Sequence, residues 1–573
     1  MPDPPDRPAT DAPWVGLSRR GFLGLVVAGV AAACSTDQDE PGGGGQGTSA
    51  EATDPSIAAL DPPAVADLDR DPFTLGVASG DPLPSSVILW TRLAPDPLNG
   101  GGLPVDSDAQ VLWEVAADEE FSELHATGIA AAPAAFGHSV HVDATGLQPD
   151  SWYYYRFRVE GFTSPVGRTR TLPSADSSPE ELRFAFASCQ HWEDGYFTAY
   201  GNLVAEDLDF VLFLGDYIYE GGVGETGVRQ HEGPEPTTVD GYRNRYALYK
   251  SDVALQEAHA AFPWIVTWDD HEVENNYAGD FDQNDSPVEQ FLERRAAAYQ
   301  VFYESMPIRT EAPVGPDLQI YREFVWGDLA RFWVLDTRQY RANQACSIIP
   351  GVDAGLDCPD IHAPDQLILG EEQELWLLDG LSGSESLWNV LAQQVVVTPT
   401  PIEGENLDLE ELGELGVTIQ NALGEDISEL EGFNFDQWDG YPEQRQRLLS
   451  ALAGTGSPNN VVLTGDIHAS AAGPLRALAD DPESEIVGAE FVGTSISSAI
   501  EDGGFGAILE SAYGPNFDYY NKDERGYVRC TVSRDEWVTT YRTVETTLEE
   551  TSAIGDDAEF ALTAGEPGLT RVS

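Results

Sequence analysis

Buried apolar runs between residues 182 and 466 constrain this chain more than any other feature. The runs are LRFAFASC (182–189), LDFVLFLGD (208–216), PWIVTWDD (263–270), ARFWVLDTR (330–338), LWNVLAQQVVVT (387–398) and NNVVLTGD (459–466). Runs this apolar fit strands that are buried on both faces. Stretches of helical periodicity lie between them, EQFLERRAAAYQVFYESM (289–306) and EEQELWLLDGL (371–381). Alternating strands and helices predict a sheet covered on both faces.

Four of these runs end on side chains that suit metal ions. The end residues are Cys189, Asp216, Asp269–Asp270 followed by His271, and Asp466 followed by His468. Carboxyl ends of parallel strands meet at one edge of a sheet, where ligands bind. One strand-end aspartate alone usually caps a helix or forms a turn. Four such ends with thiol, phenol and imidazole partners predict a shared metal site.

Residues 71–172 have a different pattern, of short strands punctuated by turns. Tyr153, Tyr155 and Phe157 alternate along one face of the run WYYYRFRV, as in a half-buried strand. The stretch GLQPDSWYYYRFRV (146–159) resembles the corner of a fibronectin-type sandwich. We expect a small β-sandwich domain here with a structural role.

The N-terminal segment is typical of an export signal. Arg19 and Arg20 precede an apolar stretch over 21–33 that is too short to span a bilayer. The pattern resembles a twin-arginine signal over residues 1–34. Cys34 then precedes an acidic, Gly/Ser-rich linker over 35–70, which resembles a lipoprotein site with its tether. A larger aliphatic residue three before the cysteine is missing, so lipidation and simple cleavage both remain open.

The net charge excludes one class of partner. The 573 residues include 98 acidic and 30 basic ones, a formal charge of −68. Only Lys250 and Lys522 are lysines. Such a surface repels nucleic acid and anionic lipid, so binding through a basic patch is excluded. We interpret it as a strongly solvated surface and hypothesise a high-salt habitat, where salt screens the self-repulsion.

The remaining cysteines have separate roles. Cys346 and Cys358 flank a polar loop in an exported chain, which favours a disulfide between them. Cys530 shares a strand face with Val528 and Val532, and we expect it to be a buried small hydrophobe. The acidic segment 404–431 is expected to form a solvated helix or excursion, and the acidic tail over 546–573 to be mobile at its end.

Five motifs together resemble a known family. SCQ, GDYIYE, TWDDHEVENN, LDTRQYR and GDIHAS are similar, in order and spacing across about residues 70–545, to the motifs of PhoD-type alkaline phosphatases of the calcineurin-like metallophosphoesterase superfamily. The resemblance implies an α+β, or mixed α/β, fold. It consists of a two-sheet sandwich flanked by helices in a metallophosphatase domain over 180–545, after the small sandwich domain.

The resemblance also implies metal ligands, one Fe³⁺ and one or two Ca²⁺. Asp216 would bridge the ions, and Cys189, Tyr219 and His468 would complete the ligands of the iron. Asp270 and Asp466 stand where most of the superfamily has Asn and His, and the change to hard oxygen favours calcium. Asn275 or Asn276 would add a further oxygen, and Asn276 is our choice.

Other residues are candidates for contact with a phosphate. The resemblance implies that His271 contacts the phosphoryl group or the leaving oxygen. Arg243 or Arg245 could grip the phosphate with a bidentate guanidinium, or pair with the abundant acids; we choose Arg243. His191 and His231 lie in loops near the motifs. Asp336 and Arg338 we interpret as a structural ion pair.

The sequence therefore predicts an exported, extracellular or cell-surface enzyme, a monomer that acts on small phosphate esters. It would hydrolyse phosphate monoesters, with diesterase side activity, by attack of a metal-activated water or hydroxide. A phosphodiesterase or phospholipase D-like enzyme acting on lipid or wall polymers is the alternative. An inactive, tethered binding lipoprotein would have lost ligands, and none of the six candidate metal-binding side chains from Cys189 to His468 is missing.

Overall fold

Three short parallel strands lie at the centre of the larger sheet of the computed structural model. They are β9 (Glu181–Ala187), β10 (Phe210–Leu214) and β11 (Pro263–Thr267). The structure describes residues 60–573 except 67, 225–226, 285, 346–353, 357–358, 404–415, 418–430, 435 and 501–509. All residues of β10 and β11 are buried, which explains why their sequences are uninterrupted apolar runs.

Seven further strands extend this sheet in the order β25-β24-β23-β22-β9-β10-β11-β1-β2-β5. Their bounds are β22 Arg525–Ser533, β23 Glu536–Val544, β24 Ile554–Thr563, β25 Thr570–Arg571, β1 Val77–Leu83, β2 Ser86–Arg92 and β5 Ser139–Thr145.

A second sheet, of order β12-β13-β15-β18-β20-β19-β21, packs on the first. Strands β13, β15, β18 and β20 are parallel to one another. The bounds are β12 Arg322–Trp326, β13 Ala330–Val334, β15 Trp388–Ala392, β18 Asn460–Thr464, β19 Ser470–Arg476, β20 Ile486–Val492 and β21 Tyr519–Asn521. A small sheet joins β14 (Ala354–Leu356), β17 (Glu431–Asn434) and β16 (Ile402–Glu403).

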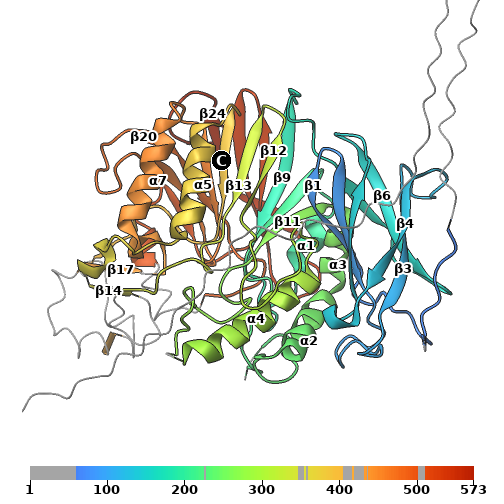
Figure 1. Ribbon diagram of the computed structural model, residues 1–573. Helices are drawn as coiled ribbons and strands as arrows, with labels where there is room; N and C mark the ends of the chain where they lie inside the picture. Colours follow the sequence, from blue (N-terminus) through green and yellow to red (C-terminus); the bar gives the residue numbers. More distant parts are fainter. Residues whose placement is uncertain are drawn as a thin grey trace, which may run out of the picture. The chain divides into compact units, whose positions relative to one another are not determined.

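Helices cover the outer faces of both sheets (Figure 1). On the larger sheet they are α1 (Thr198–Leu203), α2 (Val239–Lys250), α3 (Val253–Ala261) and α4 (Val288–Ser305), and on the second sheet α5 (Gly370–Ser382) and α7 (Pro442–Gly454). The 3₁₀ turns are η1 (Ala134–Phe136), η2 (Pro359–His362) and η4 (Trp438–Gly440). The expected two-sheet sandwich flanked by helices is confirmed, and its central core contains Phe184, Leu212 and Phe332.

The N-terminal β-sandwich is present, but it shares a sheet with the catalytic half. β3 (Ala109–Ala116), β4 (Leu124–Ala132), β6 (Trp152–Val159), β7 (Phe162–Thr163) and β8 (Gly167–Arg170) form one sheet. Its partner is the β1–β2–β5 end of the larger sheet. As expected, Tyr153, Tyr155 and Phe157 face the sandwich core. The Tyr153 hydroxyl accepts a hydrogen bond of 2.8 Å from the Gln148 N–H, as a tyrosine corner does.

The C-terminal segment differs from the expected mobile end. Residues 554–563 form β24 along β23, and Phe560 is buried in the core. Alternation of apolar and acidic residues in IGDDAEFALT is the strand signal that the acidic composition obscured. Cys530 is buried in β22, as expected.

Several expectations fall on residues outside the described ranges: the signal and Cys34, the Cys346–Cys358 disulfide and most of 404–431. In the described part of the chain, no helix has the length and apolarity needed to cross a membrane.

Candidate metal centre

The predicted ligands lie just beyond the ends of parallel strands, in an unusual backbone conformation. Cys189, Asp216, Asp466 and His468 follow β9, β10 and β18 and have φ of 58°, 59°, 66° and 57°. Asn276 has φ of 54°. Non-glycine residues rarely adopt this left-handed region, which costs on the order of 1–3 kcal/mol each and is concentrated at functional sites. The chain turns sharply after each strand and directs these residues to one place.

The first group contains the four residues that we assigned to iron. One ligand atom each from Cys189, Asp216 and His468 lies within 4.8 Å of the others. The Tyr219 hydroxyl lies 2.9 Å from Oδ2 of Asp216 and 2.9 Å from Nε2 of His468. Ser498 Oγ donates to the same hydroxyl at 2.8 Å. One thiol, one carboxylate, one phenol and one imidazole therefore converge.

A second group of carboxylates adjoins the first. Asp216, Asp270 and His271 have ligand atoms within 4.8 Å of one another, and so do Asp269, Asp270 and Asp466. Asp216 thus belongs to both groups, and Asp270 joins the two sets of residues within the second group. The Asn276 N–H donates to Oδ2 of Asp270 at 2.6 Å, so the backbone of this asparagine lies beside the second group.

Glu220, which the sequence left unassigned, holds His271 in place. Its Oε2 lies 2.6 Å from Nδ1 of His271, and its Oε1 accepts the Asn275 N–H at 2.8 Å. Burial opposes protonation of His271, but Glu220, Asp270 and Asp216 outweigh it and raise the pKa of His271 well above its ordinary value. The glutamate fixes the ring so that Nε2 is free of this bond.

Glu272 organises the backbone of both strand ends. Its carboxylate accepts the N–H groups of Asp216 at 3.1 Å and Asp269 at 2.8 Å, and also that of Tyr217. It is 1% exposed. This single side chain links the turns after β10 and β11.

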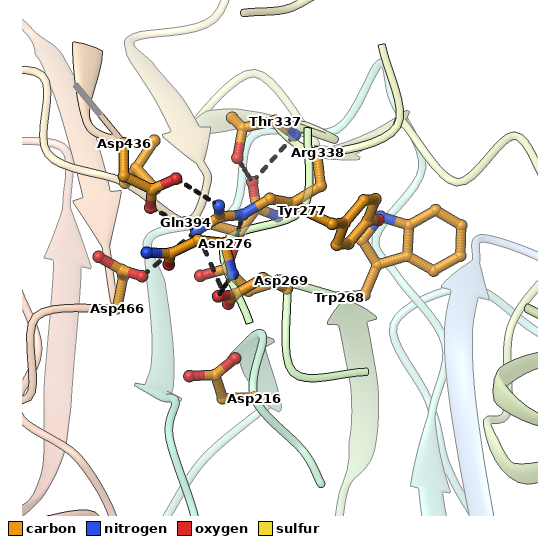
Figure 2. Close-up of polar contacts among 12 residues, drawn as sticks. Asp216, Trp268, Asp269, Asn276, Tyr277, Thr337, Arg338, Gln394, Asp436 and Asp466 are labelled. Atoms are coloured by element: carbon orange, nitrogen blue, oxygen red, sulfur yellow. Dashed lines mark hydrogen bonds and ion pairs between the residues drawn. The ribbon is translucent and has the colours of Figure 1, made fainter. Parts of the chain in front are cut away.

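Arg338 lies among the carboxylates (Figure 2). Its guanidinium binds Asp436 in bidentate fashion, at 2.7 and 2.8 Å, and its Nε donates to Asp269. Its Nη2 lies 3.4 Å from Oδ1 of Asp466 and 3.6 Å from Oδ1 of Asp270. The expected ion pair between Arg338 and Asp336 is wrong, because Arg338 reaches the Asp336 carboxylate through its backbone N–H and not through its guanidinium.

The charges and the unpaired oxygens fit bound cations. Oδ1 of Asp216, Oδ2 of Asp269 and Oδ1 of Asp270 are buried without a hydrogen-bond partner among the described residues. The cluster contains two guanidiniums, of Arg338 and Arg341, and five carboxylates, of Asp216, Asp269, Asp270, Asp436 and Asp466. When all of these groups are ionised, three negative charges are left uncompensated. Buried charges need partners or metal ions. The donor set therefore fits metal ions.

The titration behaviour of the protein groups supports the same conclusion. Burial, with Asp270 and Asp269 nearby, holds the pKa of Asp216 well above its ordinary value. Burial and Asp216 likewise raise the pKa values of Cys189 and Tyr219. Burial and Arg525 lower the pKa of His468 to about 3, so its imidazole is neutral and able to ligate. A thiolate and a phenolate here would require cations.

The structure does not bring Arg243 into this centre. Its guanidinium binds Glu304 of α4 at 2.7 Å through two nitrogens and donates to the Ala135 carbonyl at 2.9 Å. The prediction that Arg243 contacts phosphate is wrong, since this side of α2 faces the N-terminal sandwich. Arg245 instead donates to the carbonyls of Tyr219 and Gly221, so it fixes the loop that carries Tyr219.

His191 and His231 form a third group with Glu193, within 4.8 Å. The His191 ring packs edge-on against Tyr219, with centroids 4.5 Å apart. The Tyr249 hydroxyl accepts the N–H groups of Trp192 and Tyr219, so its own proton is directed to Nε2 of His231. His231 then carries its proton on Nδ1.

The sequence assigned no role to four residues that hold the candidate ligands, namely Glu220, Glu272, Asp436 and Gln437, and it paired Arg338 with the wrong carboxylate. Gln437 donates from Nε2 to Oδ2 of Asp466 at 2.7 Å, while its Oε1 accepts the Val396 N–H. Glu220 and Glu272 sit inside the motifs and could have been found there. Asp436 and Gln437 lie in a stretch without a motif, and nothing in the sequence marked them.

Comparison with known proteins agrees with this geometry. The family model described as PhoD-like phosphatase matches residues 184–541, and that of its N-terminal domain matches residues 59–173. Alkaline phosphatase D of Bacillus subtilis (strain 168) is 46% identical over 532 residues, which cover 90% of this chain and 85% of that protein. A solved structure described as that of PhoD superposes with a TM-score of 0.80 at 45% identity, covering 89% of this chain and 94% of the other. The chain therefore belongs to the PhoD-like phosphatase family.

Proposed function

We propose that this chain is an alkaline phosphatase that hydrolyses phosphate monoesters, with phosphodiesterase side activity, and that it depends on bound metal ions. The convergence of Cys189, Asp216, Tyr219 and His468 beside Asp270 and Asp466 carries the proposal. A carboxylate shared by two adjoining groups is the arrangement that two-ion phosphoester chemistry uses.

We assign one Fe³⁺ to the first group and one or two Ca²⁺ to the second. Thiolate, phenolate and imidazole suit iron, whereas Asp270, Asp466 and the Asn276 side chain offer hard oxygen, which calcium prefers. When bound, the ions supply neutralisation of the phosphate charge and acidification of an attacking water. This local positive charge offsets the repulsion between an anionic ester and a chain of charge −68.

The side chains around the metal site donate the proton to the leaving group and hold the candidate ligands in place. His271, held through Nδ1 by Glu220, keeps Nε2 free of that bond and donates a proton from it to the leaving oxygen. Arg338 and Gln437 hold the two oxygens of Asp466, and Glu272 holds the turn at Asp216. A fixed set of donors needs little rearrangement during the reaction, which favours the transition state.

Elemental analysis of the purified protein and a visible spectrum test the proposal together. We expect iron and calcium, with a phenolate-to-iron charge-transfer band that Tyr219→Phe shifts or abolishes. Asp216→Ala should lose activity, while Cys530→Ser, on a distant core strand, should retain it. A metal-free wild-type protein, or an active Asp216→Ala variant, would overturn the enzyme proposal.

Rates on a nitrophenyl monoester and the matching diester rank the two ester classes. A monoester rate far below the diester rate would favour the phosphodiesterase or phospholipase D-like alternative. The alternative of an inert binding lipoprotein predicts no turnover of either ester.

For location and organisation, we propose export by the twin-arginine route to the cell surface or medium, as a monomer, with Cys34 as the lipid attachment site where the chain is anchored. Boundaries at 34, 70 and 172 separate the signal, the linker and the sandwich from the catalytic part, which continues past 545 because β24 and β25 belong to its sheet. The −68 charge supports a surface adapted to high salt.

A further inference from the structure

Arg525 lies on a segment that is tied to the metal centre through residues 494–498. The segment 494–498 contacts the iron group directly: Ser498 Oγ donates to the Tyr219 hydroxyl, and the Ser498 N–H donates to the Cys189 carbonyl at 3.3 Å. The same segment holds both neighbours of Arg525. Thr494 Oγ1 donates to the Glu524 carbonyl at 2.6 Å and contacts the His468 carbonyl at 3.4 Å. The Gly526 N–H donates to the Ser495 carbonyl at 2.9 Å.

The guanidinium of Arg525 is half-buried and lacks a close acid. Its Nη1 donates to the carbonyls of Lys522 and Glu524, at 2.8 Å each. Among the residues that the structure describes, no carboxylate oxygen lies within 4.0 Å of its nitrogens, although 98 acidic residues surround 30 basic ones in the chain. On the same strand, Arg529 pairs with Glu206 at 3.1 Å. A cation left without a carboxylate in such a protein is available for an anionic ligand.

The strand register agrees with this placement. β22 pairs antiparallel with β9, with Val528 opposite Phe186, and this register brings Arg525 to the end of β9, near Cys189. Arg525 therefore lies beside the first group, where the ester would bind.

We propose that Arg525 binds the phosphate group of the substrate and sets the preference for monoesters over diesters. The inference rests on the proposed function of this site. A monoester has three non-bridging oxygens and up to two negative charges, whereas a diester has two such oxygens and one charge. The Nε and Nη2 donors of Arg525 suit the additional oxygen of the monoester, because a planar guanidinium can donate two parallel hydrogen bonds to a phosphate.

The test compares 4-nitrophenyl phosphate with methyl 4-nitrophenyl phosphate on the metal-loaded full chain. Arg525→Gln should lower kcat/KM for the monoester by about 10- to 100-fold, the range for a hydrogen bond to a charged group, and that for the diester less than about threefold. Arg525→Lys keeps the charge without the bidentate geometry and should recover part of the loss. Arg529→Gln, on the same strand but paired with Glu206, is the matched control and should leave the ratio of the two rates unchanged.

Calorimetry with inorganic phosphate gives a second readout that does not depend on turnover. The Kd of phosphate should rise about tenfold in Arg525→Gln at unchanged metal content. Equal loss of both esters, or unchanged phosphate affinity, would overturn the role of Arg525. Wild-type protein that hydrolyses neither ester would overturn the proposed function, and the phosphate Kd of the two proteins would still decide for or against Arg525.

Discussion

Replacement of Arg338 by Met should destabilise the protein by more than any surface substitution could. The guanidinium is fully buried and makes a bidentate pair with Asp436, at 2.7 and 2.8 Å, and further contacts with Asp269 and Asp466. Removal of one partner from a buried ion pair leaves uncompensated charge, which costs about 3–5 kcal/mol. Methionine has similar length, so the cavity effect is small. We therefore expect a loss of about 3–5 kcal/mol in the free energy of unfolding.

The matched control is Arg447→Met on α7. Arg447 pairs with Glu374 at 2.6 Å, but its side chain is 43% exposed. Solvent screens such a pair, so its loss should cost less than about 1 kcal/mol. Urea unfolding in the presence of a chelator measures both variants without bound cations. Equal losses in the two variants would refute the argument from burial.

The pair of Arg338 and Asp436 also predicts how the free energy of unfolding depends on pH. Burial raises the pKa of Asp436, but Arg338 and Arg341 outweigh it, and the net pKa lies below the ordinary value. A carboxyl with a lowered pKa contributes stability above its unfolded pKa, near about 4, and loses it as the pH falls through the folded value. The difference in the free energy of unfolding between wild type and Arg338→Met should therefore become smaller below about pH 4. A difference independent of pH would contradict this explanation.

Three further predictions follow from individual contacts. Burial lowers the pKa of Lys250 to about 7. Above that pH the unfolded chain binds more protons than the folded one, so the free energy of unfolding of the wild type should rise between about pH 7 and 10. The free energy of unfolding of Lys250→Met should change less over the same range. Glu220→Gln removes the charged partner of His271 and should lower kcat about 10- to 100-fold at unchanged metal content; an unaltered kcat would contradict its positioning role. A chelator that removes calcium should abolish activity and lower Tm, and added Ca²⁺ should restore both, because unpaired oxygens such as Oδ1 of Asp270 would lose the cation of the proposed calcium site.

The ends of the buried strands could be predicted because two independent signals coincide there. Apolar runs locate the strands, and parallel pairing of β9, β10 and β11 brings residues such as Cys189 and Asp216 to one edge. The ligand identities came from the motifs. The left-handed φ at Asp216 and His468 could not be read from the sequence, because only glycine announces that conformation reliably.

The sequence could not show which arginine approaches the metal centre, because this depends on the three-dimensional arrangement of α2 and β22. Arg243 and Arg245 are two positions apart on α2, and about 200° of helical rotation separates them. One therefore reaches Glu304 and the other the Tyr219 loop. Arg525 is distant in sequence from every motif, and only the pairing of β22 with β9 brings it near Cys189.

The N-terminal sandwich is structurally part of the catalytic sheet, which the sequence could not indicate. β1 pairs in parallel with β11, with Gly80 opposite Trp264, and a side chain at Gly80 would come within 2.5 Å of the Trp264 carbonyl. The buried Asp81 of β1 binds Arg322 at 2.6 Å, and Arg322 donates to the Val266 carbonyl of β11. Because β11 delivers Asp269, Asp270 and His271, the sandwich supports the strand that carries the second group of ligands. The family model of the N-terminal domain therefore accompanies the catalytic one for a mechanical reason: without β1, this strand would lie at the edge of the sheet.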